Sequence, residues 1–437
     1  MARDRSGEVS LVWPNKDMIL VAVGERDYQW KPADFATPSS RITELATVGS
    51  GGSNIVACGD ALDAVAALEN EGVLLPGSIR MLYVDPPFNT GHSFEDYDDG
   101  LDRAIWLSMF RDRLIAVQPF LAPDSSVWVH LDDSENHRAR CVLDEVFGTE
   151  AFVTTVIWQK RTTRESRSAF STNHDNILVY APAGPRAWKR RRNLLAKSVK
   201  ELRNRDGDPR GPWADAPFTA PGFRANQQYP IVNPAGKRLL PPRGRSWYAT
   251  QPTYLQLLAD DRIWFPRGGA GSPRLKLFPH QIRGLVPFSV WGSAETGTND
   301  DAKRHLQMLF PANTNVFATP KPEELLERII HISTDPGELV VDLFAGSGTT
   351  AAVAQKMGRE WIAIERSPTT VVTVLLPRLG MVVAGCDPGG ITEAQNWTGG
   401  GSFRVIQVQP SLGRVTEVHV PTLRALTTAR ARSCRAS

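Results

Sequence analysis

Short apolar runs alternate with helix-patterned segments in the first half of the chain. The runs, each bounded by turn-forming residues, are Asn54–Ala57, Met81–Val84, Ser126–Leu131, Phe152–Trp158 and Ile177–Tyr180. Between them, apolar residues recur at helical spacing over Ala61–Glu71, about 104–120 and 135–147. Short apolar runs of this kind are typical of buried strands, and their alternation with helices predicts a doubly wound parallel sheet.

The same pattern returns near the C-terminal end of the chain. It predicts helices over Pro322–Ile332 and Ala351–Met357, and strands over Leu339–Leu343, Trp361–Ile364 and Phe403–Val408. The two patterned stretches therefore read as two halves of one α/β domain, 54–183 and 285–408.

The segments outside these halves lack the pattern. Residues 1–53 are polar and irregular and end in Gly49–Ser53, so we expect an N-terminal extension with a flexible linker. Residues 184–284 are rich in proline, glycine, arginine and tryptophan and predict a loop-rich inserted domain. Residues 409–437 form an arginine-rich tail.

Charge is distributed unevenly along the chain, although its net charge is only +3. Residues 159–290 contain 24 lysines and arginines against 8 acidic residues, so this segment carries +16 and the remainder −13. A basic segment inside an acidic protein favours a polyanionic partner, and its interleaved aromatic residues suit phosphate contact with base stacking. The alternative is a solvated basic surface.

Other features of composition limit the classes of protein further. Four cysteines lie far apart with no Cys-x-x-Cys pair, which argues against a disulfide framework and for a reducing cytoplasm. No apolar run approaches membrane-spanning length, and the N-terminus has no apolar core of a signal peptide. We expect a cytoplasmic protein with no membrane partner.

The strand Met81–Val84 is followed by Asp85-Pro86-Pro87-Phe88. Proline cannot donate to a strand ladder, so the strand must end there in a stiff turn that carries a carboxylate and an aromatic ring. In open α/β sheets, ligands bind at the carboxyl ends of the strands. The alternative is an exposed turn without a ligand.

A second candidate site is the glycine-rich turn from Asp342 to Thr350. Gly346 and Gly348 let the backbone approach a ligand, and Glu365 ends the next strand, where an acid can accept hydrogen bonds from ribose hydroxyls. No Gly-Lys-Ser/Thr follows, which excludes a P-loop. Ala351 occupies the third glycine position, so a dinucleotide stays open. Asp60, after the first strand, can contact a ligand or cap the next helix.

These two motifs together resemble those of S-adenosylmethionine-dependent amino-methyltransferases of DNA bases. The catalytic motif precedes the cofactor motif, as in the circularly permuted β class. Further segments are similar to the modification (Mod) subunits of type III restriction-modification systems: Trp106–Phe110, His130–Glu135, Leu143–Gly148, Trp158–Arg161, Asn173–Tyr180 and Phe317–Pro322. The resemblance covers roughly 54–183 and 285–408 and implies a Rossmann-like class I methyltransferase sheet, with 184–284 as target-recognition domain.

The resemblance also implies roles for individual residues. Asp85, Pro86, Pro87 and Phe88 would act on an adenine N6 amino group of a base flipped out of double-stranded DNA. The cofactor, S-adenosyl-L-methionine, would contact Asp60, Thr319, Lys321, Asp342, Phe344, Ala345, Gly346, Ser347, Gly348, Thr349 and Glu365. Lys160, Arg161 and Arg164 follow a strand end and would contact DNA phosphate; ordinary surface charge is the alternative. A homodimer and a helicase-nuclease restriction subunit are partners that the resemblance leaves open, in a prokaryotic or phage setting.

Several alternatives remain at this point. The same amino-group chemistry fits a cytosine-N4 methyltransferase, although an aspartate at the first motif position favours adenine. An RNA methyltransferase, a weakly active recognition subunit of a restriction complex and a nicotinamide oxidoreductase are the others. His130, Asp132 and Asp133 resemble a metal cluster, but Asp132-Asp133 can equally cap the following helix. We expect no metal.

Overall fold

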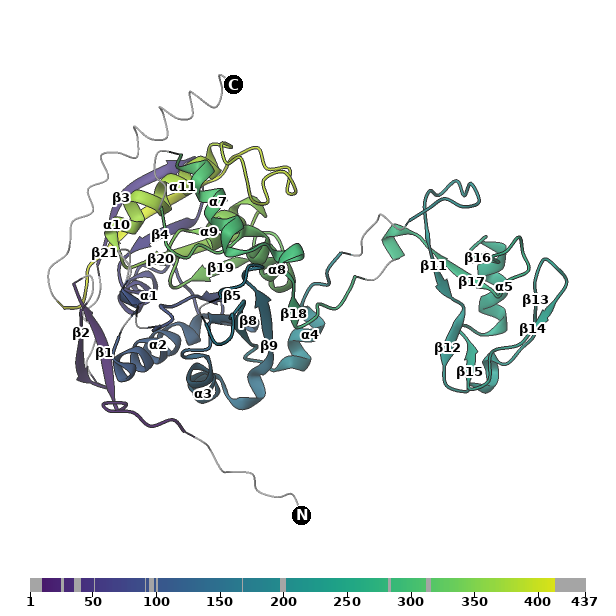
Figure 1. The fold of residues 1–437 in the computed structure, drawn as a ribbon, viewed down its shortest axis with the longest axis horizontal. Helices are drawn as coiled ribbons and strands as arrows, with labels where there is room; N and C mark the ends of the chain where they lie inside the picture. The colour runs from purple at the N-terminus through teal and green to yellow at the C-terminus, as the bar shows by residue number, and fades with distance from the viewer. Residues whose placement is uncertain are drawn as a thin grey trace, which may run out of the picture. The chain divides into compact units, whose positions relative to one another are not determined.

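A computed structural model of the chain describes residues 10–24, 27–34, 41–50, 52–90, 92–93, 98–99, 101–166, 168–196, 202–281, 284–311 and 316–412. These residues form two compact units (Figure 1). Unit 1 comprises Met1–Asn193 and Phe288–Ser437, and unit 2 comprises Leu194–Pro287. Most of the basic tail predicted for 409–437 lies outside the described residues.

Unit 1 is built on a 10-stranded sheet with the order β18-β9-β10-β8-β5-β19-β20-β4-β21-β3. Neighbours from β8 to β21 run parallel, whereas β10 and β3 are antiparallel to their neighbours. The strands are β3 (Ile42–Gly49), β4 (Asn54–Cys58), β5 (Ile79–Val84), β8 (Leu121–Leu131), β9 (Phe152–Gln159), β10 (His174–Tyr180), β18 (Val290–Trp291), β19 (Leu339–Asp342), β20 (Glu360–Glu365) and β21 (Ser402–Val408). The predicted doubly wound α/β fold is confirmed.

Helices cover both faces of this sheet (Figure 1). One layer contains α1 (Ala61–Asn70), α2 (Arg103–Val117) and α3 (Asn136–Phe147), whose apolar side chains pack with those of the central strands in one core. The other layer contains α8 (Glu323–Ser333), α9 (Thr349–Lys356) and α11 (Leu376–Val383). The other α-helices of unit 1 are α4 (Pro185–Arg191), α6 (Ser293–Thr296), α7 (Asn299–Leu309) and α10 (Pro368–Thr370). β6 (His92–Ser93) pairs with β7 (Asp98–Asp99).

The chain before residue 54 is not the irregular extension that its sequence predicts. β1 (Met18–Val23) and β2 (Asp27–Pro32) form an antiparallel hairpin, and Leu20 of that hairpin is buried in the main core. β3 pairs with β21 and forms one edge of the large sheet. In the segment 49–53, expected to be a flexible linker, Gly49 ends β3 and both Gly49 and Gly52 lie close to Ser402, whereas Gly51 lies outside the described residues.

The inserted unit begins later than the predicted boundary at 184. α4 belongs to unit 1, because Trp188 is buried against Trp128 and Arg191 pairs with Asp335 and Glu338. The basic run at 189–192 is therefore partly committed to ion pairs in unit 1. Unit 2 starts at 194 and ends at 287, compared with the predicted 284.

Unit 2 has its own small core. Its elements are β11 (Ala214–Pro217), β12 (Thr219–Pro221), β13 (Ile231–Val232), β14 (Arg238–Leu239), β15 (Arg245–Trp247), α5 (Gln251–Ala259), β16 (Ile263–Trp264) and β17 (Arg274–Leu277). The core is aromatic, with Phe218, Tyr229, Trp247 and Tyr254 buried in it. Aromatic residues that the sequence offers for base stacking therefore fill this core, although Phe223 and Tyr248 are exposed.

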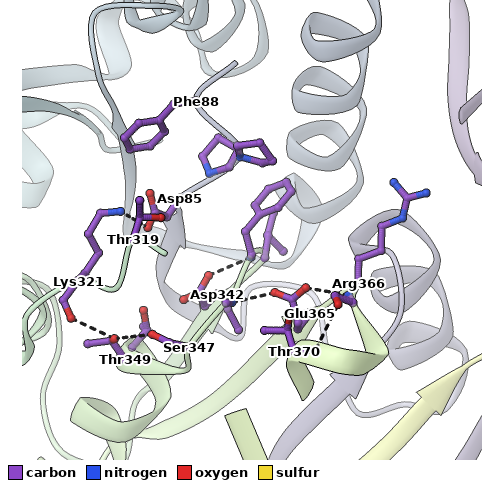
Figure 2. A pocket seen from close by; sticks show the side chains of 18 of the residues that line it. Asp85, Phe88, Thr319, Lys321, Asp342, Ser347, Thr349, Glu365, Arg366 and Thr370 are labelled. Atoms are coloured by element: carbon purple, nitrogen blue, oxygen red, sulfur yellow. Dashed lines mark hydrogen bonds and ion pairs between the residues drawn. The ribbon is translucent and has the colours of Figure 1, made fainter. Parts of the chain in front are cut away.

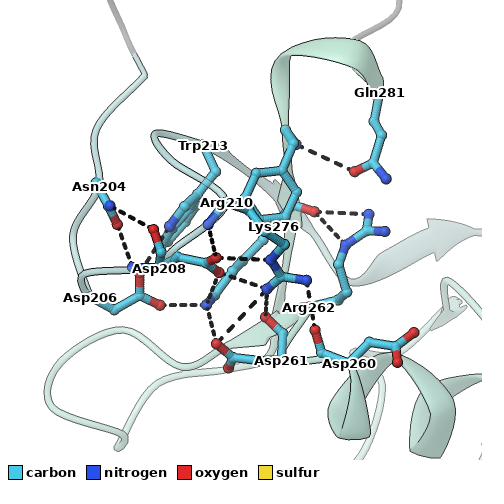
Figure 3. Close-up of polar contacts among 11 residues, drawn as sticks. Asn204, Asp206, Asp208, Arg210, Trp213, Asp260, Asp261, Arg262, Lys276 and Gln281 are labelled. Carbon is cyan, nitrogen blue, oxygen red and sulfur yellow. Dashed lines mark hydrogen bonds and ion pairs between the residues drawn. The ribbon is translucent and has the colours of Figure 1, made fainter.

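In unit 2, β11, β17 and β16 form a three-stranded sheet. Buried Lys276 on β17 joins the N-terminal part of the unit to this sheet by ion pairs (Figure 3). The Lys276 ammonium is 2.5 Å from Asp206, 3.0 Å from Asp208 and 2.9 Å from Asp261. Arg210 adds a second cation on Asp208 at 2.6 Å. A buried ammonium needs such partners, since an unpaired charge in an apolar surrounding is strongly destabilising.

Among the described residues, no helix has both the length and the apolar character to cross a membrane.

Candidate active site

Four acidic residues meet at one edge of the large sheet. β5, β19, β20 and β4 are consecutive parallel strands, and their carboxyl ends carry or lead into Asp85, Asp342, Glu365 and Asp60. All four acids line one pocket of about 410 Å³. Figure 2 shows Asp85, Asp342 and Glu365 in this pocket. Its volume lies in the range of roughly 300–1,000 Å³ that small-molecule sites occupy. The two motifs, far apart in the sequence, therefore face a common cavity.

The Asp-Pro-Pro-Phe turn is held from two sides. Lys321 Nζ lies 2.7 Å from a carboxylate oxygen of Asp85 and 5.0 Å from the centre of the Phe88 ring. On the other side, the indole N–H of buried Trp106 donates to the carbonyl of Pro87 at 2.6 Å. Lys321, an expected cofactor contact, is thus the ion-pair partner of Asp85 and is not a solvated surface lysine.

The glycine-rich turn needs its two glycines for conformational reasons. Gly346 and Gly348 have φ angles of +48° and +79°, which residues with a side chain rarely adopt. A Cβ at Gly346 would also lie 2.9 Å from the Phe317 ring. Thr349 Oγ1 donates to the carbonyl of Lys321 at 3.1 Å, which ties this turn to the segment that carries the partner of Asp85.

Buried Arg378 on α11 holds the same turn by hydrogen bonds. Its guanidinium donates to Thr349 Oγ1 at 2.8 Å and to the Ser347 carbonyl at 3.3 Å. It also pairs with Glu323 at 3.0 Å. The carboxylate of Glu323 in turn accepts from Lys356, so a buried ionic cluster fixes the turn.

Asp342 and Glu365 have perturbed acidity. Burial raises the pKa of Asp342 to about 7, and the negative charges of Asp85 and Glu365 raise it as well. Burial also raises the pKa of Glu365, although this carboxylate accepts hydrogen bonds from the backbone N–H groups of Gly346 and Ser367, each at 2.8 Å. Asp85 and Asp60 are balanced by Lys321 and Arg113, so the raised pKa values of Asp342 and Glu365 mark the part of the pocket that favours a cationic ligand.

Asp60 is both a helix cap and an ion-pair partner. Its carboxylate accepts from the Leu62 N–H at the start of α1 and makes two contacts of 2.7 Å with the buried Arg113 guanidinium. These interactions hold the pKa of Asp60 below its usual value even though burial raises it. Asp60 lines the pocket but its charge is balanced by Arg113.

The hairpin β1–β2 supplies a wall that the sequence did not indicate. Tyr28 lines the pocket, with the guanidinium carbons of Arg366 and Arg113 at 4.4 Å and 5.4 Å from its ring centre. Arg366 also donates to the carbonyls of Gly24 and Asp27, which fastens the hairpin to the end of β20. No motif marks Tyr28, because its contacts are with residues distant in sequence.

Most of the predicted site residues line the pocket. These are Asp60, Asp85, Pro86, Pro87, Phe88, Lys160, Thr319, Lys321, Asp342, Phe344, Ala345, Gly346, Ser347, Thr349 and Glu365. Gly348, Arg161 and Arg164 are outside the lining. Lys160, expected on DNA phosphate, pairs with Asp175 at 2.6 Å, and Arg161 contacts Glu165 and Ser171. Arg164 is exposed.

His130, Asp132 and Asp133, which resemble a metal cluster in the sequence, each have hydrogen-bond partners in the structure. Both ring nitrogens of His130 have hydrogen-bond partners, Tyr83 and Asp175. Asp132 accepts from the Ser134 N–H, and Asp133 accepts from Asn176. The N-cap of α3 is Glu135, so the suggestion that Asp132 and Asp133 cap this helix is wrong.

Both motifs of the pocket lie in a region that matches a known protein family. A family model described as DNA methylase matches residues 79–374. The chain belongs to the DNA methylase family. The matched region runs from β5, before Asp85, past Glu365, so it includes both motifs of this methylase. The hairpin with Tyr28 and the strand before Asp60 lie outside it.

Named relatives of this DNA methylase include Mod subunits of type III restriction-modification enzymes and type II methyltransferases. The type III restriction-modification enzyme StyLTI Mod subunit of Salmonella typhimurium (strain LT2) is 29% identical over 341 residues, covering 70% of this chain and 50% of that protein. The type II methyltransferase M.EcaI of Enterobacter cloacae is 28% identical over 383 residues, covering 84% of this chain and 77% of that protein. The chain spans about half the length of the Mod subunits that it matches.

A solved structure was also matched. It is a putative DNA modification methylase from Thermus thermophilus, complexed with S-adenosyl-L-methionine. The TM-score is 0.38 at 16% sequence identity, and the alignment covers 80% of this methylase and 99% of that chain.

Proposed function

We propose that this DNA methylase transfers a methyl group from S-adenosyl-L-methionine to the exocyclic N6 of an adenine flipped out of double-stranded DNA. The observation that carries the proposal is the shared pocket of the Asp85–Phe88 turn and the glycine-rich turn, on the neighbouring strands β5 and β19. One turn offers acceptors to an amino group, and the other offers a cradle to a nucleoside cofactor.

The charges of the pocket fit this cofactor. S-adenosyl-L-methionine supplies an electrophilic methyl group on a positively charged sulfur, and its methionine end carries an ammonium. Burial raises the pKa of Asp342, and this carboxylate would bind the ammonium of the cofactor. Phe344–Gly348 would contact the same methionine end. Glu365 would bind the ribose hydroxyls, and Asp60 would lie near the adenine. Thr319, Lys321 and Thr349 would complete the wall between cofactor and base.

The amino group of adenine is a poor nucleophile, because its lone pair is delocalised into the ring. The Asp85 carboxylate and the Pro86 carbonyl would accept its two hydrogens, which makes the nitrogen more tetrahedral and directs its lone pair at the methyl group. The N–CH₃ bond forms as the S–CH₃ bond breaks, and the amino nitrogen then loses one proton to solvent. Rate enhancement of this kind rests on positioning and electrostatics.

Lys321 has a defined part in this scheme. By pairing with Asp85 at 2.7 Å, its ammonium fixes the position of one carboxylate oxygen. Phe88 would stack on the extruded base. Flipping a base costs about a few kcal/mol, and stacking on an aromatic side chain returns roughly 1–3 kcal/mol, so Phe88 would offset much of the flip.

Contacts with the duplex are assigned to unit 2 and to the edge of unit 1. Unit 2 would act as the target-recognition domain, and Arg161 and Arg164 would contact phosphate. Lys160 would do so only by exchanging its ion pair with Asp175. The names of the Mod-subunit relatives support a restriction subunit as an assembly partner, whereas a homodimer and a location in a bacterial cytoplasm stay predictions from the sequence.

Transfer of radiolabelled methyl from S-adenosyl-L-methionine to duplex DNA tests the proposal. Wild-type protein should label DNA, and Asp85→Ala should lose labelling while it still binds the cofactor. Glu71→Ala, which removes an exposed carboxylate at the end of α1, serves as a control that keeps activity. Undiminished labelling by Asp85→Ala would refute the assigned mechanism, and labelled cytosine instead of adenine would redirect the proposal to N4.

A further inference from the structure

His130 on β8 supports the aromatic ring of the Asp-Pro-Pro-Phe turn. Its side chain is fully buried, and its imidazole is stacked with the Phe88 ring, with centroids 6.0 Å apart and an angle of 23° between the planes. Trp158 of β9 meets the same imidazole edge-on at 5.3 Å and 84°. One face of Phe88 thus rests on a side chain that is itself enclosed.

The imidazole has a fixed orientation because both nitrogens are hydrogen-bonded. Nε2 lies 3.2 Å from Asp175 Oδ2, and Nδ1 lies 2.9 Å from the Tyr83 hydroxyl. Burial raises the pKa of Asp175, but the hydrogen bond from His130 and the positive charges of Lys160 and Lys321 lower it to about 2, so Asp175 is an ionised acceptor. Nε2 therefore carries the proton, and Nδ1 accepts from Tyr83.

A cation completes this row of side chains. Asp175 Oδ1 binds the Lys160 ammonium at 2.6 Å, so each oxygen of that carboxylate has a partner. The row Tyr83, His130, Asp175 and Lys160 crosses four adjacent strands, β5, β8, β10 and the end of β9. Burial and the nearby Lys321 charge lower the pKa of His130, which keeps the imidazole neutral.

We propose that His130 is a positioning residue for methyl transfer: a neutral imidazole, locked by Tyr83 and Asp175, that holds the Phe88 ring in place to stack on the flipped base. This inference rests on the proposed function. It assigns His130 no contact with the base or the cofactor, because its partners are Phe88, Trp158 and the hydrogen-bonded row. A hydrophobic residue could fill the same volume, but its orientation would not be fixed by two hydrogen bonds.

Single-turnover methylation of duplex DNA, with cofactor binding measured in parallel by calorimetry, tests this role. His130→Gln keeps a donor and an acceptor but removes the ring. We expect its methyl-transfer rate to fall roughly 10- to 100-fold, as for a misplaced reacting group, with cofactor affinity unchanged. Tyr83→Phe removes one hydrogen bond and should give a smaller loss. His137→Gln, on the exposed side of α3, is the matched control.

The double substitution of His130 and Phe88 separates a positioning role of His130 from a purely structural one. In a Phe88→Ala background, His130→Gln should cause no further loss of rate, because the ring that it supports is gone. Equal losses with and without Phe88, or a wild-type rate in folded His130→Gln, would overturn the proposal. If His130→Gln does not fold, the same two comparisons with Tyr83→Phe decide. Failure of the wild-type chain to methylate DNA would instead refute the proposed function.

Discussion

The ionisation of Asp342 should govern how strongly the cofactor binds. Burial raises the pKa of this carboxyl to about 7, and Asp85 and Glu365 act in the same direction. The ammonium and sulfonium charges of S-adenosyl-L-methionine favour the ionised form. Binding below pH 7 therefore requires Asp342 to lose a proton, so affinity should rise with pH up to about 7 and level off above it.

The magnitude follows from the fraction of Asp342 that is ionised before binding. For a pKa of about 7, that fraction is about one in eleven at pH 6 and about ten in eleven at pH 8. The dissociation constant should therefore be about 10-fold larger at pH 6 than at pH 8, which corresponds to about 1.4 kcal/mol.

The same carboxyl should lower the stability of the ligand-free protein. Its pKa is 3.8 when unperturbed and about 7 in the folded chain, so between these values the folded state binds more protons than the unfolded state. Stability from this group is therefore lost as pH rises from about 4 to 7, by at most about 4 kcal/mol. Asp342→Asn should raise the unfolding temperature at pH 8 while it weakens cofactor binding.

Isothermal titration calorimetry of the cofactor from pH 5.5 to 8.5 provides the assay. Wild type should show the rise and plateau, Asp342→Asn should bind weakly with little dependence on pH, and Asp17→Asn, at an exposed position, should match wild type. An affinity that does not change with pH in the wild type would refute the reasoning. So would an unaltered pH profile in Asp342→Asn.

Three further substitutions test other parts of the account. Tyr28→Ala should raise the dissociation constant for the cofactor about fivefold, measured by calorimetry, whereas Gln29→Ala on the exposed side of β2 should have no effect; equal effects would exclude Tyr28 from the site. Arg378→Met, which removes the donors to Ser347 and Thr349, should weaken cofactor binding about 10-fold; unchanged binding would contradict the support assigned to it. Lys276→Met leaves three carboxylates without their shared cation and should lower the unfolding temperature of unit 2 by roughly 10 °C, with cofactor affinity unchanged. Hydrogen exchange of unit 2 in the full chain checks this, and backbone amides as protected from exchange as in the wild type would contradict the stabilising role of Lys276.

The central strands could be predicted from the sequence because they are buried on both faces. β4, β5, β19 and β20 read as continuous apolar runs, and each ends at a turn former or an acid. The pocket residues at their ends followed directly, since carboxyl ends of parallel strands share one edge of a sheet.

β1, with the sequence MILVAV, is an apolar run and could have been predicted as a strand, but the other two N-terminal strands could not. β2 has the sequence DYQWKP and β3 has ITELATVG, and neither is an apolar run, because each faces solvent on one side. What orders them is pairing with distant partners: β3 with β21, and the hairpin with Arg366 and α2. Tyr28 was missed with them.

Side-chain pairings across the site were equally inaccessible. The ion pair of Lys321 with Asp85 joins the two halves of the domain, on either side of the inserted unit. The roles of His130 and Lys160 depend on Asp175, which belongs to another strand. Neither periodicity nor motif spacing contains this information, because it arises from the order of strands in the sheet.

Nucleoside analysis of DNA incubated with the protein and S-adenosyl-L-methionine is the most direct test of the central claim. The account predicts N6-methyladenine in DNA treated with the wild-type protein and none in DNA treated with Asp85→Ala. DNA without a methylated base, or N6-methyladenine at the wild-type level with Asp85→Ala, would contradict it.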